Sequence, residues 1–184
     1  MESQTITVNY DSLQDRIVVF VRGAVSSYAL QLTRRFTFAM LAALSRQVQN
    51  TQGDTRLAKA GLQDELLSMK HVHAVSQIRN AQAEAPSSPL PPLQMPAEMP
   101  IHLTSRVDIR HDSDGATTLL FFVADETVGK LVFQVRELHW FLERLLAHGQ
   151  QAGWSDAVPV PAWLTQQSVD EAASSALVTS TTMH

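Results

Sequence analysis

The stretch Ala81–Pro100, AQAEAPSSPLPPLQMPAEMP, holds six of the eight prolines of the 184-residue chain. Proline fixes φ and lacks a backbone N–H, so such a run cannot continue a helix or a central strand. We therefore predict a semi-extended linker across residues 81–100 that divides the chain into two parts. The segments on its two sides decide the fold class.

The N-terminal part carries the signals of three strands followed by a helix. Thr5–Tyr10 and Tyr28–Leu32 alternate apolar and polar residues, and Arg16–Arg22 is rich in β-branched residues. These patterns are typical of strands. Thr33 is a suitable N-cap, and apolar residues at helical spacing predict a helix from there to about Val48.

A second helix is predicted over Thr55–Arg79, after the polar break at Asn50–Asp54. Its apolar residues recur at spacings of three and four, at Leu62, Leu66, Met69, Val72, Val75 and Ile78. The resulting stripe drifts around the helix. It therefore indicates packing against a globular body rather than a long coiled coil.

The C-terminal part repeats the order of strands and helix. The predicted strands are Ile101–Arg110, Thr117–Ala124 and Lys130–Val135. Asp112–Gly115 is a strong turn signal, and Asp125–Gly129 is predicted to be a second turn. A helix is expected over Leu138–His148, with Gly149 and Gly153 ending it.

The two parts match in residues as well as in order. Ile17–Val21 corresponds to Leu119–Val123 at an offset of 102, and Phe38 corresponds to Phe141 at 103. The fold class predicted is α+β, with two similar βββα units, an extra long helix and a Pro-rich linker. The alternative is that two β-meanders with a helix resemble one another because the pattern is common. A single unit offers a thin core, so the units should pack together or be completed by a homodimer.

These patterns give the following organisation: residues 1–50 form the first βββα unit, 54–80 the connecting helix, 81–100 the linker, 101–153 the second βββα unit, and 154–184 a C-terminal extension. From about residue 166 the extension is rich in Ser, Thr and Ala, which predicts disorder. Before that point, Pro161 and Trp163 form a candidate anchor for a partner. The alternative is that this segment folds back and buries Trp163 on its own chain.

Composition excludes several chemistries. The chain has no cysteine, so disulfides, thiolate nucleophiles and thiolate zinc sites are ruled out. No apolar stretch approaches the roughly 18–20 residues needed to span a bilayer. The start Met1–Gln4 lacks the basic character of a secretory signal, so we expect a cytoplasmic protein without a membrane span.

No motif for catalysis, cofactor or metal binding is found. His71 and His73 are two apart, which on a helix directs them about 200° from each other and away from a shared ion. The acidic Asp112–Gly115 stretch is explained by the needs of a turn. There is no phosphate-binding glycine loop and no Gly-x-Ser-x-Gly motif. We predict no metal, no cofactor and no enzymatic activity, with an enzyme of unrecognised site as an alternative.

Two adjacent arginines are the most informative local feature. Arg34 and Arg35 fall in the first turn of a predicted helix, where the macrodipole prefers anions. They could reach acidic groups on the C-terminal unit, bind an external anion together with free helix N–H groups, or simply face water.

The leading functional hypothesis is a non-enzymatic protein-interaction module: an adaptor, assembly factor or small structural subunit with a protein partner or as a homo-oligomer. The alternative is binding of an anionic ligand or nucleic acid by the basic N-terminal unit, through Arg34 and Arg35. Residues 16–59 contain seven basic residues against one acidic residue. Nucleic acid is disfavoured because the arginines are spread over several elements and most aromatic residues fit core positions.

Overall fold

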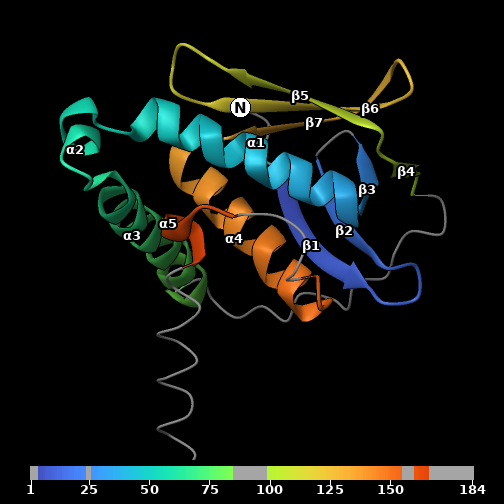
Figure 1. Cartoon of the computed structure of the whole chain (residues 1–184). Coiled ribbons are helices and arrows are strands. Elements are labelled where there is room, and N and C mark those ends of the chain that lie inside the picture. Colours follow the sequence, from blue (N-terminus) through green and yellow to red (C-terminus); the bar gives the residue numbers. More distant parts are fainter. Residues whose placement is uncertain (1–3, 24–25, 85–98, 155–159, 166–184) are drawn as a thin grey trace, which may run out of the picture.

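The computed structural model has an α+β fold in which two sheets are accompanied by helices (Figure 1). The structure describes residues 4–23, 26–84, 99–154 and 160–165. Most of the predicted linker and the segment predicted to be disordered from about residue 166 lie outside the described residues.

The first sheet begins with an antiparallel meander of β1 (Thr5–Asp11), β2 (Arg16–Arg22) and β3 (Ser27–Thr33). Helix α1 (Arg34–Gln52) follows directly. The Thr33 hydroxyl accepts a hydrogen bond from the backbone N–H of the first helical turn, which confirms the predicted N-cap. The three strands and this helix are thus where the sequence pattern predicts them.

The strand predicted over Ile101–Arg110 is wrong as a single element, because the chain divides it between the two sheets. Its first part, β4 (Ile101–Leu103), pairs in parallel with the free edge of β3. Thr104 N then donates to a carbonyl of β3 at 3.0 Å, whereas Ser105 N donates to Phe122 O in the second sheet at 2.9 Å. The chain therefore passes from one sheet to the other between two consecutive residues, and β5 (Arg106–His111) continues in the second sheet.

The single helix predicted over Thr55–Arg79 is also wrong. The structure has a short α2 (Thr55–Lys59) and a separate α3 (Gln63–Glu84). Gly61 lies between them with φ of 74°, a left-handed conformation that only glycine adopts without strain. Helix α3 also extends into the start of the predicted linker.

The second sheet is an antiparallel meander of β5, β6 (Thr117–Val123) and β7 (Glu126–Phe133). Strand β7 begins earlier than predicted, because the turn before it is confined to two residues. The turn at Asp112–Gly115 is confirmed, with Gly115 N donating to Asp112 O at 3.0 Å. Helix α4 (Val135–Gln151) follows β7.

Helix α4 ends in a Schellman motif that places a tryptophan in the core. Gly153 has φ of 70° and donates to Gln150 O, while Trp154 N donates to Gly149 O. Gly149 is therefore a helical residue, and Gly153 alone ends the helix. The Trp154 ring packs edge-on against Tyr10 at 5.8 Å between centroids.

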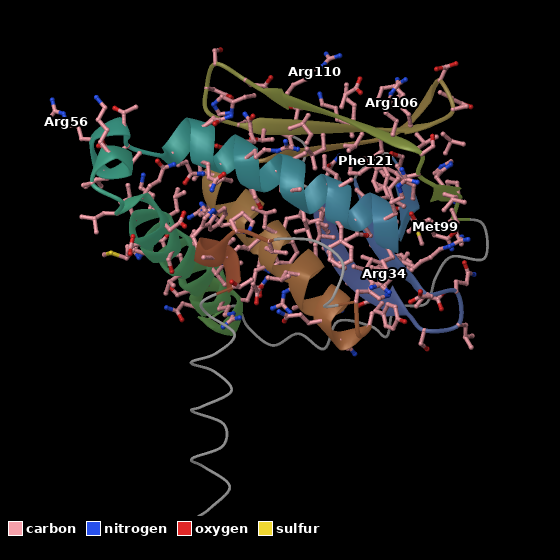
Figure 2. All side chains as sticks on the ribbon, viewed as in Figure 1. Arg34, Arg56, Met99, Arg106, Arg110 and Phe121 are labelled. Atoms are coloured by element: carbon pink, nitrogen blue, oxygen red, sulfur yellow. The ribbon has the colours of Figure 1, made fainter. Side chains whose placement is uncertain are left out.

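A single hydrophobic core joins the inner faces of the two sheets. The first sheet contributes alternate residues such as Val19 and Leu30, and the second contributes Leu119 and Leu131. Figure 2 shows Phe121 of β6 directed toward the body of the molecule, whereas Arg106 and Arg110 project from β5 on the outer side. The predicted packing of the two parts against each other is therefore observed, with separate sheets.

The helices of the two parts share this core. Helix α1 packs on β2 and β3, and α4 packs on β1 and β2 of the first sheet as well as on β7. The N-caps Thr33 and Gln134 are 101 positions apart. Aligned on these caps, every buried position of α4 corresponds to a buried position of α1. Phe141 then corresponds to Met40 rather than to Phe38.

One side chain ties the two sheets together. The Tyr28 hydroxyl of β3 donates to Lys130 O of β7 and accepts from Lys130 N, both at 3.0 Å. Gly129 permits this approach, because a Cβ there would lie 2.7 Å from the Tyr28 ring. Both backbone groups of one β7 residue thus depend on a hydroxyl from the first sheet.

We expect Tyr28→Phe to lower the free energy of unfolding by about 1–3 kcal/mol, because the Lys130 backbone groups lose their hydrogen-bond partner. Urea denaturation measures this loss. Tyr10→Phe, which removes the chain's other tyrosine hydroxyl from an exposed bond to Asp15, is the matched control and should cost less. Equal losses for the two variants would contradict a special role for the Tyr28 hydroxyl.

Candidate functional site

Arg34 and Arg35 lie exposed in the first turn of α1 (Figure 2 labels Arg34). Asp15 Oδ1 accepts from the Trp154 indole N–H and from the Tyr10 hydroxyl, both at 2.8 Å. These two hydrogen bonds, and then the nearby charge of Arg34, lower the pKa of Asp15. The acidic group that Arg34 influences therefore belongs to the first hairpin and not to the C-terminal unit.

Arg35 has no ion pair or side-chain hydrogen bond with any residue that the structure describes. Among those residues, no ion pair joins a basic residue of the 16–59 segment to an acid of the C-terminal unit. The hypothesis that both arginines reach across to that unit therefore receives no support from the described contacts.

The segment with Pro161 and Trp163 folds back on its own chain. Pro161 is half-buried and its carbonyl accepts from Leu164 N, starting the short α5 (Ala162–Thr165). Trp163 is fully buried, and its ring packs edge-on against His71 of α3 and His139 of α4, at 5.7 and 6.0 Å between centroids. A role as a partner anchor would require α5 to leave this position.

His71 and His139 form a buried pair beneath Trp163. Their Nδ1 atoms are 3.1 Å apart, and His139 Nε2 lies 3.0 Å from Gln52 Oε1. Because an amide oxygen only accepts, His139 carries its proton on Nε2 and its Nδ1 accepts from His71 Nδ1–H. His71 Nε2 is then an unprotonated, buried nitrogen, and it has no hydrogen-bond partner among the described residues.

Burial keeps both imidazoles neutral at physiological pH. Desolvation, followed by the charges of His139 and Arg79, lowers the pKa of His71 from 6.5 to about 4. Desolvation, followed by the charge of Lys70, lowers the pKa of His139 from 6.5 to about 4. Perturbed histidines of this kind mark functional sites as well as structural clusters, so the surroundings decide their role.

The predicted divergence of His71 and His73 is confirmed, because the first is buried and the second is exposed. Within the part of the chain that the structure describes, no group of three or more His, Asp or Glu side chains could hold a metal ion. The buried histidine pair is a hydrogen-bonded connection between two helices.

A groove opens above Gln52 and His139, between the α1–α2 junction, α3 and the first turn of α4. We call it the α3–α4 groove; its volume is about 980 Å³. Its apolar lining consists of Leu57, Leu66, Ala74 and Val135, and its polar lining of Thr51, Gln52, Asp54, Lys70, His73, Gln77, Gln134, Arg136 and His139, with Gly53. A site of this size is within the range of small-molecule pockets.

Two basic side chains stand on facing walls of this groove. Lys70 of α3 donates to Gln52 O at 2.7 Å and so satisfies a carbonyl at the end of α1. Arg136 of α4 is exposed and has no ion pair or side-chain hydrogen bond with any described residue. One carboxylate, that of Asp54, also lines the groove, where it caps α2 by accepting from Arg56 N and Leu57 N.

A second cavity, of about 790 Å³, lies on the other side of α4, beside the start of β1 and strand β7. Trp140 lines it, and the buried indole N–H of this residue has no partner among the described residues. Glu137 lines it too, but its carboxylate already accepts from Gln134 N at 2.8 Å. This cavity therefore has one buried donor without a partner among the described residues and one carboxylate that is already hydrogen-bonded.

The outer face of α3 exposes large apolar side chains. Met69 and Val72 of α3 are 71% and 41% exposed, and Leu62, the residue immediately before the helix, is 49% exposed on the same side. The inner face of the same helix is occupied, with Leu67 and His71 buried against the body. We call Leu62, Met69 and Val72 the outer α3 face.

Comparison with known proteins gives no relative: no family model, no curated protein and no solved structure matches the chain. In the described part of the chain, no helix has the length and apolar character needed to cross a bilayer.

Sequence reasoning missed the histidine pair and the groove. The available signal was that His71 falls between Leu67 and Val75 on the buried stripe of its helix, which marks it as a core histidine. Its partner His139 follows Leu138 on the buried side of α4 in the same way. Nothing in the sequence, however, indicates that these two helices lie side by side.

We expect stability to fall steeply as the pH drops from 6.5 toward 4. In this window the unfolded chain protonates both histidines while the folded chain keeps them neutral, so stability present above pH 6.5 is lost. Each histidine contributes about 1.4 kcal/mol per pH unit. Urea midpoints measured across this window test the slope.

The variant His71→Phe should make the slope shallower by about half, since one of the two titrating groups is removed. His73→Gln, which removes an exposed imidazole from the same helix, is the matched control and should keep the wild-type slope. A His71→Phe variant with an unchanged pH dependence would show that the buried pair does not set it.

Proposed function

We propose that this protein is a non-enzymatic interaction module, an adaptor, assembly factor or small structural subunit, that docks a protein partner on the outer α3 face. The observation that carries the proposal is the exposure of Met69 and Val72 on α3, with Leu62 just before it on the same side, while the other side of the helix is already packed. Single exposed apolar residues are ordinary on protein surfaces, whereas a group on one face favours an interaction site.

The chemistry of this face indicates the kind of partner. Methionine is flexible and polarisable, so an exposed Met69 can adapt to the apolar side chains of another protein. The spacing of three and seven residues suits a helical or extended segment that lays apolar side chains along α3. Such a segment could come from another protein or from a second copy of this chain.

The exposed group can be tested with a photo-crosslinking amino acid at position 69. In native extract it should give one reproducible adduct, and the same label at Arg110, on the outer side of the second sheet, should not. A Leu62→Asp/Val72→Asp variant should lose the adduct with little change in unfolding free energy, because both side chains are exposed. No reproducible adduct, together with a monomeric mass in solution, would overturn the proposal.

The similarity of the two βββα parts supports a second element of the proposal, an internal duplication. Both parts have an antiparallel meander followed by a helix. The matching burial of α1 and α4 at an offset of 101 adds to the sequence correspondence. A duplicated origin would account for a body in which each helix covers a sheet face.

Anion binding by the basic N-terminal unit is the second functional hypothesis. It is favoured by Arg35, which stands exposed in the first turn of α1 without a partner among the described residues. Salt-dependent binding of a phosphate-bearing ligand that is lost in Arg34→Ala/Arg35→Ala would support it. Absence of binding at low salt would eliminate it.

A further inference from the structure

We propose that the α3–α4 groove binds a small anionic amphiphile, a molecule with a carboxylate or phosphate head and an apolar body. The site is separate from the outer α3 face and from the arginines of α1, so it stands independently of the proposed docking function. Basic and amide side chains from three elements line the groove, and several of their N–H groups have no partner among the described residues.

The head group would meet donors from three elements. Arg136 presents a guanidinium from α4 that has no partner among the described residues. Lys70 lies on the α3 wall and donates one of its three N–H groups to Gln52 O, which leaves two for a ligand. The Gln52 side chain uses its oxygen on His139, which leaves its amide N–H groups available to the ligand.

The position of Arg136 is itself unfavourable without an anion. It is the second residue after the N-cap of α4, where the helix dipole disfavours a positive charge. An anion bound between this guanidinium and the helix N-terminus would relieve that repulsion and accept a bidentate pair of hydrogen bonds. Glu137, the acidic residue of the same turn, lines the cavity on the other side of α4. It therefore does not line the groove beside Arg136.

The body of the ligand would contact an apolar surface. Leu57 of α2, Leu66 of α3 and Val135 of α4 line the groove, and Val135 is 44% exposed. Burial of an alkyl or aryl body against them is favourable at roughly 25 cal/mol per Å². Asp54 is the one acidic residue in the lining, and as the N-cap of α2 its carboxylate already accepts from backbone N–H groups of that helix.

The test is a titration of the full chain followed by ¹H–¹⁵N NMR at the backbone amides of Val135 and Arg136. The probes are octanoate and octyl phosphate, with octan-1-ol as the body without a charge and inorganic phosphate as the charge without a body. Both octyl anions should shift these amides with saturation, and they should bind more tightly than either incomplete probe. The two anions also distinguish a carboxylate head from a phosphate head.

Arg136→Gln should weaken binding of the octyl anions about tenfold, since a charge-assisted hydrogen bond is lost. The matched control is Arg110→Gln, which removes an exposed arginine on the outer side of the second sheet, away from the groove, and should leave the affinity unchanged. Equal affinity for octan-1-ol, equal affinity of the two variants, or shifts confined to other parts of the chain would overturn the proposal.

Discussion

The constraint on which the structure depends is that the apolar face of the first sheet needs helices from both halves of the chain. Helix α1 packs on β2 and β3, while α4, which follows the second sheet, packs on β1 and β2. A three-stranded sheet with one helix is too small to bury its own apolar surface. The two βββα parts consequently form one body around one core (Figure 1).

Two features near β3 fix how the second sheet meets the first. Strand β4 pairs in parallel with β3 and delivers the chain to β5 within two residues. On the inner side, Tyr28 reaches from β3 to both backbone groups of Lys130, over the surface that Gly129 leaves free. The chain connection through β4 and the Tyr28 hydrogen bonds both start from β3. Together they restrict movement of the second sheet relative to the first.

The local part of this fold could be predicted from sequence, because strands and helices follow from periodicity and capping. Thr33 as N-cap, the turn at Asp112–Gly115 and the meanders are of this kind. The division at Thr104 could not be predicted, since alternation continues through it and only tertiary pairing breaks the strand. The histidine pair likewise depends on the contact between two helices. The local sequence could not decide whether Trp163 is buried on its own chain or anchors a partner, and the structure shows it buried. The sequence does not single out Arg136, because the groove that it lines is formed by residues from three other elements.

Helix α3 is the element on which the candidate sites converge. Its inner side holds Leu67 and the His71–His139 bond, its edge lines the α3–α4 groove through Lys70, and its outer side is the apolar face of Met69. The attachment of α3 to α4 includes polar contacts, among them the Arg79–Glu143 ion pair at 2.7 Å. The His71–His139 hydrogen bond is buried, and breaking a polar contact in a low-dielectric interior is costly, so this bond fixes the register between the helices. Because Lys70 and Arg136 line the groove from these two helices, the same register sets the distance between the groove's two basic side chains.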